Sequence, residues 1–281
     1  IFIGRLAGSG TAGTVTDSNI GIGTSVLQNI NGADNNVIVG RSAGENISTG
    51  GNNVLLGYYA GNALTTEAGN VAVGHNALQA ETATAGNNGY NVAVGYQAMR
   101  NASGASSNVA IGYQAAVADD LTGDNNTTIG AYAGYNLTSA PHNVLLGFKA
   151  GYSSTTLGYN VFIGSQAASG ATGVDNSVVI GREAMSVGAA TGDDNVYIGY
   201  QAAYSNTQGS LNTAVGFKSF YTNTTGNYNV AIGDLALSGN IGGNRQVAVG
   251  HEAMRMFSQA GDVQNTAVGQ KAMYNLSLIH I

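Results

Sequence analysis

One short stretch recurs along the whole chain, and its best example is residues 91–99, NVAVGYQAM. We take the glycine of each copy as its anchor. Ten of the fifteen intervals between anchors are 17 residues, and the others are 18, 18, 19, 19 and 21 residues. A short fixed period is typical of a solenoid, in which each repeat packs on its neighbours. The sixteen anchors are Gly4, Gly23, Gly40, Gly57, Gly74, Gly95, Gly112, Gly130, Gly147, Gly164, Gly181, Gly199, Gly216, Gly233, Gly250 and Gly269.

The residues before each anchor predict a β-strand. The residue directly before the glycine is Ile, Val or Leu in all sixteen copies, and the residue three before it is Val, Ile or Thr. β-Branched residues at a period of two indicate a strand. We expect these two positions to face the core and the glycine to form a bend that needs a positive φ or a close backbone approach.

An asparagine column precedes the strands. The position four before the anchor is Asn in thirteen of the fifteen copies that contain it, with Ser177 and Gln246 as the exceptions. In a stack of coils, these side chains predict a ladder in which each amide binds its neighbour and the turn backbone. The ladder residues are Asn36, Asn53, Asn70, Asn91, Asn108, Asn143, Asn160, Asn195, Asn212 and Asn229.

The residue two before the anchor is apolar in nearly every copy and is most often alanine. Its neighbours on both sides are assigned to the core, so the alternation of a strand places this column on the opposite, outer face. An exposed apolar stripe of this length favours a partner, and small side chains allow backbones to approach closely. We therefore predict a self-association surface, in a parallel homotrimer. The stripe comprises Ala72, Ala93, Ala110, Ala214, Ala231, Ala248 and Ala267.

The rest of each repeat is a looser arm rich in Gly, Asn, Asp and Thr, which is turn chemistry. Pairs four residues apart, such as Ala43 and Ile47, are also consistent with a short helical turn. Glycines at positions 44, 61, 134 and 151 count against anything longer. One coil buries too little apolar surface to fold alone, so stability must come from stacking.

These features predict an all-β fold, a parallel β-solenoid (β-roll or β-helix) of about sixteen 17-residue coils. We expect one repeat domain over residues 1–275, a fragment of a longer fibre. Residues 276–281, LSLIHI, break the pattern and resemble the translation of a sequencing adapter, so we predict that they are not native to the protein.

Composition limits the possible functions. The net charge is −6 with nine Lys and Arg residues scattered over the chain, which argues against a nucleic-acid partner. There is no apolar run long enough to span a bilayer, so we expect no membrane insertion in this fragment. Without cysteine, neither a disulfide nor a thiolate metal site forms. The histidines, including His75, His142 and His251, stand alone in sequence, and we predict no catalytic residue and no cofactor.

Acidic residues recur six positions before the anchors, at Asp17, Asp34, Asp124, Asp175 and Asp193. A short carboxylate at this turn is expected to accept turn N–H groups in Asx-turns. The alternative is a calcium site, because Asp175, Asp193 and the adjacent Asp194 fall in neighbouring coils.

Two other classes stay open as alternatives. An ice-binding solenoid requires threonines in a regular array; threonine recurs, but we find no constant register for it. A polysaccharide-processing β-helix enzyme requires clustered acids and bases, whereas the charges here are spread thinly.

The unit Asn-Val-Ala-Ile-Gly-x-x-Ala resembles the β-roll head repeat of trimeric autotransporter adhesins. The pieces at residues 95–98, GYQA, and 224–227, TTGN, resemble the repeat arrays of bacteriophage tail fibres. The resemblance covers residues 1–275. It implies a non-catalytic structural and receptor-binding fibre segment on a virion or a bacterial outer surface. The implied partners are further copies of the chain and a host or cell-surface receptor, with glycans among the candidates.

Overall fold

The computed structural model describes residues 1–10, 17–79, 89–118, 121–257, 260–262 and 264–275. The predicted non-native tail, residues 276–281, lies outside this set. The chain divides into two compact units, residues 1–142 and 143–281. Each is described by itself below, and the single domain over 1–275 stays a prediction.

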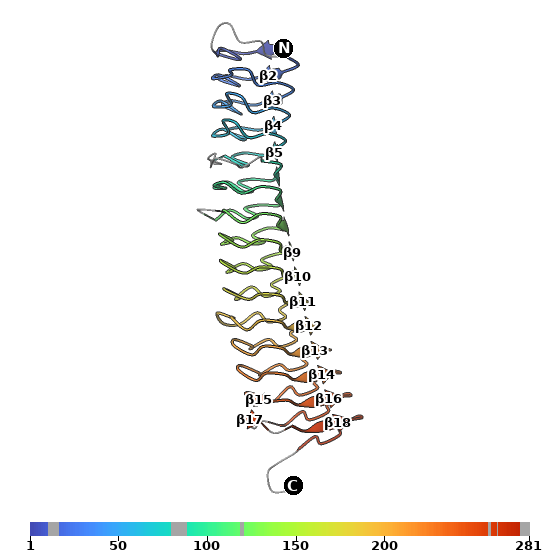
Figure 1. The fold of residues 1–281 in the computed structure, drawn as a ribbon. Coiled ribbons are helices and arrows are strands. Elements are labelled where there is room, and N and C mark those ends of the chain that lie inside the picture. The colour runs from blue at the N-terminus through green and yellow to red at the C-terminus, as the bar shows by residue number, and fades with distance from the viewer. Residues whose placement is uncertain (11–16, 80–88, 119–120, 258–259, 263, 276–281) are drawn as a thin grey trace. The chain divides into compact units, whose positions relative to one another are not determined.

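The first unit is a stack of coils with one strand each. Every strand pairs in parallel with the next in sequence, and equivalent residues face each other: Ala72 of one strand is opposite Ala93 of the next. Figure 1 shows the successive coils of β2 to β5 lying one above the other. The strands are β1 (Phe2–Ile3), β2 (Ile20–Ile22), β3 (Val37–Val39), β4 (Val54–Leu56), β5 (Val71–Val73), β6 (Val92–Val94), β7 (Val109–Ile111) and β8 (Thr127–Ile129).

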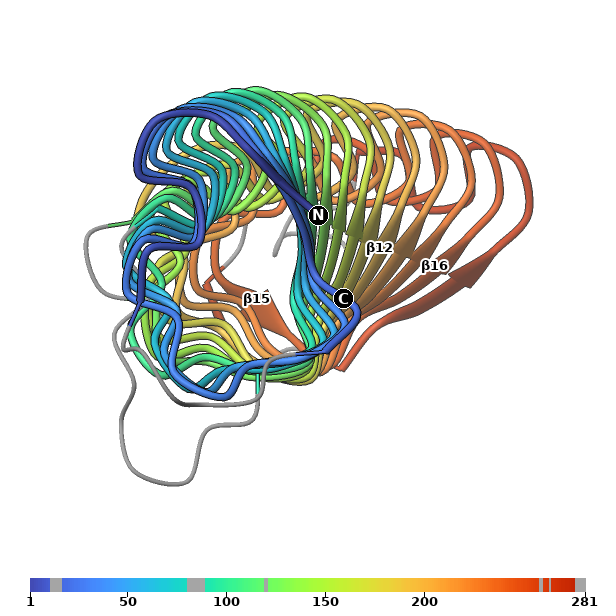
Figure 2. The ribbon, with the colours of Figure 1, turned by 90° about the horizontal axis from the view of Figure 1, so that it is seen from above.

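The second unit repeats this plan, again with parallel pairing in register. A short second pair, β15 (Gly243–Asn244) with β17 (Gly261–Asp262), lies across the coil from β16 and β18 (Figures 1 and 2). The main strands are β9 (Val144–Leu146), β10 (Val161–Ile163), β11 (Val178–Ile180), β12 (Val196–Ile198), β13 (Thr213–Val215), β14 (Val230–Ile232), β16 (Val247–Val249) and β18 (Thr266–Val268).

The predicted fold class is confirmed: the chain is an all-β parallel solenoid with coils of about 17 residues. In the described ranges, each anchor glycine directly follows a strand of the main stack. The fixed strip between Asn and Gly is therefore the structural unit that the repeat specifies.

The anchor glycines hold a conformation that other residues avoid. Their φ angles lie between +122° and +144°, a region that is essentially restricted to glycine. A Cβ on Gly57 would also overlap the carbonyl oxygen of Gly74 in the next coil. Both expected reasons for the glycine column, a positive φ and close backbone approach, are confirmed.

The arm after the anchor alternates between left- and right-handed residues. Gln97 has a φ of 55° and Met99 a φ of 48°, on either side of Ala98. Their N–H groups do not point the same way: Gln97 N–H donates to His75 O of the preceding coil, and Met99 N–H donates to Ala115 O of the following one. The predicted helical turn is wrong, because alternating handedness directs the N–H groups to neighbouring coils instead of along a helix.

The glycines in this arm are explained by the same alternation of left- and right-handed residues. Gly44, Gly61, Gly134 and Gly151 have φ angles of +51° to +58° at the position that Met99 occupies in its own coil. They supply the left-handed conformation without the penalty that a side chain carries there.

The alanine column faces the interior. The seven residues of the predicted self-association stripe, Ala72, Ala93, Ala110, Ala214, Ala231, Ala248 and Ala267, are all buried, with exposed fractions of 0–3%. The valines and isoleucines beside them are half-buried or exposed. The prediction of the stripe was therefore wrong, as was the assignment of its neighbours to the core.

The interior explains why alanine suits this column. The inward strand residue and the alanine three residues after the anchor, such as Ala93 and Ala98, are both fully buried in the interior of the coil. Larger residues, Phe162 and Tyr197, take the same inward position in other coils and are fully buried. Where the position is Gly21, the ring of Phe2 from the preceding coil lies against it. A large side chain in one coil thus fills the space beside a small residue in the next coil.

The asparagine ladder is confirmed. Asn53 shows the pattern: its backbone N–H donates to Asn36 Oδ1 at 2.9 Å, and its Nδ2 donates to the same oxygen at 3.1 Å and to Glu67 O at 3.1 Å. Its own Oδ1 accepts the backbone N–H of Asn70 at 2.9 Å. Hydrogen bonds of this pattern join Asn36, Asn53, Asn70, Asn91 and Asn108 in the first unit and Asn143, Asn160, Asn195, Asn212 and Asn229 in the second, where Ser177 provides the link between Asn160 and Asn195.

We predict that Asn53→Asp destabilises the first unit more than Asn53→Ala does. Alanine removes the hydrogen bonds and should lower the free energy of unfolding by about 2–4 kcal/mol. Aspartate also places a second carboxylate oxygen against Asn36 Oδ1 and the carbonyl of Glu67, where the donor used to be. Urea denaturation measures both, with the exposed Asn31→Ala as the control. Equal stability of Asn53→Asp and wild type would contradict the ladder.

We also predict that Gly57→Ala costs more than Gly32→Ala. Both glycines have a positive φ, but a Cβ on Gly57 overlaps the next coil, whereas a Cβ on Gly32 has nothing within 4 Å. The Gly32 change should cost about 1–2 kcal/mol for its conformation alone, and the Gly57 change more. Thermal unfolding followed by circular dichroism compares them, and equal midpoints would show that stacking tolerates the Cβ.

Candidate binding surfaces

The outer face of the strands carries two apolar columns in each unit. They are the residues one and three before each anchor, which sequence analysis assigned to the core. Val37 and Val39 of β3 are 37% and 36% exposed, and Val144 and Leu146 of β9 are 37% and 40% exposed. Between each such pair lies an inward residue that is fully buried. The outer face is therefore a regular, largely apolar surface that the fold of one chain leaves accessible.

A second surface follows the position just after the anchor. In the first unit the rings of Tyr58, His75, Tyr96 and Tyr113 lie in successive coils, with centroids 5.0–5.3 Å apart. The guanidinium of Arg41 lies 5.8 Å from the Tyr58 ring centroid. Because the rings stack on one another, their faces contact each other, and their edges and polar atoms point outward. Within this run, each aromatic face is already covered by the next ring, so a sugar ring has no free face on which to stack.

The second unit has a shorter version of this aromatic column. The Tyr200 and Phe217 rings stack with centroids 5.5 Å apart, and the Arg182 guanidinium lies 4.7 Å from the Tyr200 ring. A hydrogen bond to Tyr200 raises the pKa of Arg182. A separate stack, Tyr204 with Tyr221, has a centroid distance of 5.2 Å and an interplanar angle of 5°.

The aspartate column binds backbone N–H groups, but not those of its own turn. Asp175 Oδ1 accepts the N–H of Gly158 at 2.6 Å, and Asp193 Oδ1 accepts the N–H of Asp175 at 2.8 Å. Each donor lies at the equivalent position of the preceding coil. The expected chemistry is right, while the expected Asx-turn is wrong, because stacking brings the neighbouring coil closer than the turn's own N–H.

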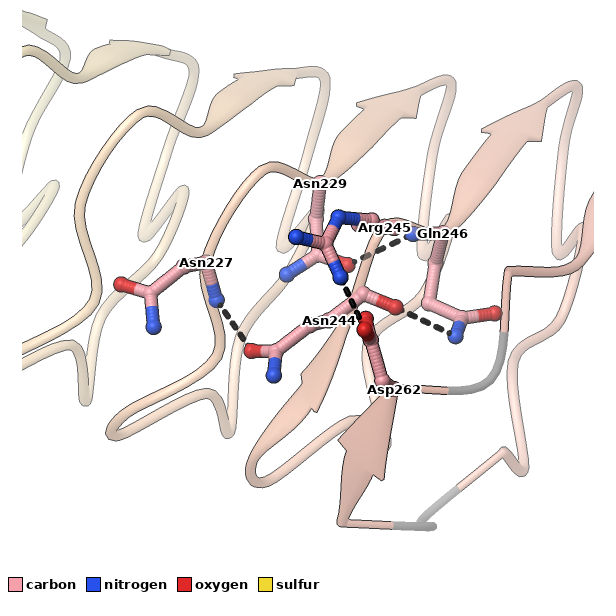
Figure 3. Close-up of polar contacts among 6 residues, drawn as sticks. All are labelled: Asn227, Asn229, Asn244, Arg245, Gln246 and Asp262. Carbon is pink, nitrogen blue, oxygen red and sulfur yellow. Dashed lines mark hydrogen bonds and ion pairs between the residues drawn. The ribbon is translucent and has the colours of Figure 1, made fainter.

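Figure 3 shows the last coils, where asparagines take the aspartate position. Asn227 N–H donates to Asn244 Oδ1 at 2.8 Å, and Gln246 N–H donates to Asn229 Oδ1 at 2.9 Å. Gln246 Nε2 turns back to Asn244 O, so the longer amide does not continue the ladder as an asparagine does. Arg245 forms an exposed ion pair with Asp262 (Figure 3).

The calcium alternative needs several oxygen ligands around one point. Among the described residues, no group of three or more His, Asp or Glu side chains is placed to hold a metal ion. Asp175 and Asp193 each use one carboxylate oxygen for a backbone N–H.

The threonines do share a register, contrary to the sequence interpretation. Thr155, Thr207 and Thr224 lie at one position of their coils, and each hydroxyl donates to a backbone carbonyl of the next coil at 3.0–3.1 Å. Each lies eight residues after its anchor glycine, so the register was already present in the sequence. Their donor hydrogens are used inside the stack and are not presented to an ice surface.

A second asparagine ladder was missed. Asn223 Nδ2 donates to Asn206 Oδ1 at 2.7 Å, and Asn240 Nδ2 donates to Asn223 Oδ1 at 3.4 Å. All three are buried at the position where Ile47 and Leu64 lie in the first unit. The recurrence of Asn three residues before a glycine, at 206, 223 and 240, was the available signal.

Besides Arg182, two titratable groups of the described residues have shifted pKa values. Burial raises the pKa of Tyr197, whose ring fills the interior of its coil. The pKa of Glu252 is lowered: burial alone would raise it, but the hydrogen bond from Arg255 and the charges of Arg255 and Lys271 outweigh that effect. His75 is exposed in the aromatic column. In the part of the chain that the structure describes, no helix is long and apolar enough to cross a membrane.

Comparisons of the chain with protein-family models, with curated proteins and with solved structures found no match. The resemblance to tail-fibre and autotransporter repeats therefore stays a prediction.

We predict that Asp193→Ala lowers the free energy of unfolding by about 1 kcal/mol, since it removes the acceptor for Asp175 N–H. Asp193→Asn should keep the stability of the wild type, because Asn227 and Asn244 perform the same role in later coils. Thermal unfolding with calcium and with a chelator measures both effects. A calcium-dependent rise in the wild-type midpoint that Asp193→Asn abolishes would favour the metal site.

Proposed function

We propose that this chain is a structural, non-catalytic segment of an extracellular fibre, either a phage tail fibre or a bacterial surface adhesin. It assembles as a parallel homotrimer and presents its loops and aromatic columns to a receptor on a host or another cell. The exposed apolar outer face of the strands carries this proposal, together with the resemblance described above.

The outer face has the size of an interaction surface. Two side chains per coil are half-buried or exposed over the eight strands of the first unit, and all of them are apolar except Thr127 of β8. If each gives up about 50 Å², one unit buries about 800 Å² per chain, which is one side of a standard protein–protein interface. Exposed apolar patches larger than a few hundred Å² mark interaction sites on soluble proteins.

A second copy of the chain is the proposed cover. The face repeats in every coil, and a rotation axis parallel to the stack keeps equivalent coils of different copies level. In a closed ring of three, the column three before the anchor on one chain meets the column one before the anchor on the next. The proposed self-association surface thus consists of the residues on either side of the buried alanines and not of the alanines themselves.

A non-catalytic role is supported by the composition and by the hydrogen bonds that the polar side chains make to neighbouring coils. Charged residues make up 9% of the chain, and catalysis needs several titratable groups that converge in a pocket. The polar columns described above bind the neighbouring coils, as the aspartates and threonines illustrate.

We predict that lysines on the outer face block assembly without unfolding the chain. The variant replaces the outward Val39, Ile111, Leu146 and Ile198, each 36–40% exposed. Sedimentation velocity at micromolar concentration should give three times the monomer mass for the wild type and the monomer mass for this variant.

The matched control places lysine at the adjacent inward position, as in Ala110→Lys. Because Ala110 is fully buried, this variant should lose its circular dichroism signal instead of merely dissociating. A well-folded wild-type monomer would refute the interface, and a dimer mass would refute the threefold ring.

The receptor is best sought with whole-cell binding and glycan arrays, using the wild-type trimer and the monomeric outer-face variant. Multivalent attachment predicts strong binding by the trimer and weak binding by the monomer. Hydrolysis of a bound polysaccharide would overturn the non-catalytic assignment.

A further inference from the structure

One column of the second unit contains a gap between an aromatic ring and a cation. The column is defined by a repeated backbone bond: Thr222 N–H donates to Ser238 O, Gly239 N–H donates to Arg255 O, and Met256 N–H donates to Tyr274 O, at 2.9–3.1 Å. The same bond joins Ser205 N–H to Tyr221 O. Successive coils therefore place Tyr204, Tyr221, Ser238, Arg255 and Tyr274 in one line.

Among these five residues only Ser238 is neither aromatic nor cationic, and Ser186 precedes Tyr204 at the same position. Tyr204 and Tyr221 stack 5.2 Å apart, which is the spacing of adjacent coils. Beyond Tyr221 the next coil has the small pair Ser238 and Gly239, and Arg255 follows in the coil after it. Two coil steps amount to about 10 Å, so a single ring fits between the Tyr221 ring and the Arg255 guanidinium.

A pocket occupies this place. Its volume is about 310 Å³, and its lining includes Lys218, Tyr221, Thr222, Ser238, Arg255 and Met256. This volume is at the lower end of the range for small-molecule sites, about 300–1,000 Å³. The walls combine a ring, apolar side chains, hydroxyl groups and two cations.

Arg255 is held in place by contacts with residues outside the pocket lining. Arg255 Nη1 forms an ion pair with Glu252 and lies 3.5 Å from the Tyr274 hydroxyl. Glu252 is shared with Lys271, whose Nζ is 3.5 Å from its carboxylate. One carboxylate thus serves two cations. Lys218 Nζ lies 5.2 Å from the Tyr221 ring centroid, so the pocket has an excess of positive charge in an otherwise acidic chain.

We propose that this pocket binds an acidic sugar residue, a pyranose ring that carries a carboxylate. The ring stacks on Tyr221, the carboxylate pairs with Arg255 and Lys218, and the sugar hydroxyls meet Thr222 and Ser238 of the pocket lining. A guanidinium suits a carboxylate because its fork of donors matches the two oxygens. This inference deepens the receptor-binding part of the proposed function and rests on it.

Saturation-transfer NMR of the full chain tests the proposal, with glucuronate as the probe and glucose and benzoate as comparisons. We expect clear transfer to the ring protons of glucuronate and at least fivefold weaker transfer to glucose. Arg255→Gln and Lys218→Gln should each weaken glucuronate binding about tenfold, as expected for the loss of a charge-assisted hydrogen bond.

Ser238→Tyr is the decisive variant, since it continues the aromatic column and fills the gap. It should abolish glucuronate binding. Ser186→Tyr is the matched control, because Ser186 lies at the same position of its coil as Ser238, and it should leave binding unchanged. Circular dichroism checks that each variant keeps the wild-type fold.

The proposal is overturned if the wild type shows no transfer at tens of millimolar glucuronate, if glucose binds equally well, or if Ser238→Tyr still binds glucuronate. Benzoate binding as strong as that of glucuronate would overturn the sugar assignment in favour of a planar aromatic acid. The outcome is separate from the assembly test: a trimer that ignores glucuronate refutes this site alone, and a monomer that binds glucuronate refutes the trimer alone.

Discussion

Hydrogen bonding from coil to coil through the asparagine column is the interaction on which the rest of each unit depends. A 17-residue coil closes around too few apolar side chains to be stable by itself. Asn53 links its coil to those before and after it through its backbone N–H, its side-chain oxygen and its side-chain nitrogen. Since the amide is buried, no water can replace a lost partner, and each link sets the position of the next.

The glycine column and the arm complete this arrangement. The anchor backbone passes so close to the next coil that no Cβ fits, and the alternating left-handed residues direct N–H groups to both neighbouring coils. Non-glycine residues such as Met99 adopt this conformation at a cost, which the inter-coil hydrogen bonds offset. Backbone polarity is thus satisfied by stacking, and the side chains outside the coil are free to vary.

The surfaces follow from that freedom. Because every coil is in register with the next, one choice repeated along the sequence becomes a column: apolar on the strand face, aromatic after the anchor. In such a molecule, a binding surface forms where a column repeats one type of side chain, or where such a column is interrupted. The stack of Tyr204 and Tyr221 ends at Ser238, and the missing ring leaves the pocket beside Arg255.

The sequence alone determined the period, the strand before each glycine, the parallel stacking, the asparagine ladder and the need for glycine, because each is local or repeats with every coil. It did not determine which face of the strand is inside. Val92, Ala93 and Val94 are all apolar, so alternation identifies two faces without orienting them. Only the tertiary structure decided this. In the closed coil the side chain of Ala93 is buried in the interior, and those of Val92 and Val94 lie on the outer face. The threonine register and the gap at Ser238 follow the 17-residue spacing of the sequence, but only the tertiary structure shows the hydrogen bonds and the pocket that they form, because both depend on the neighbouring coils.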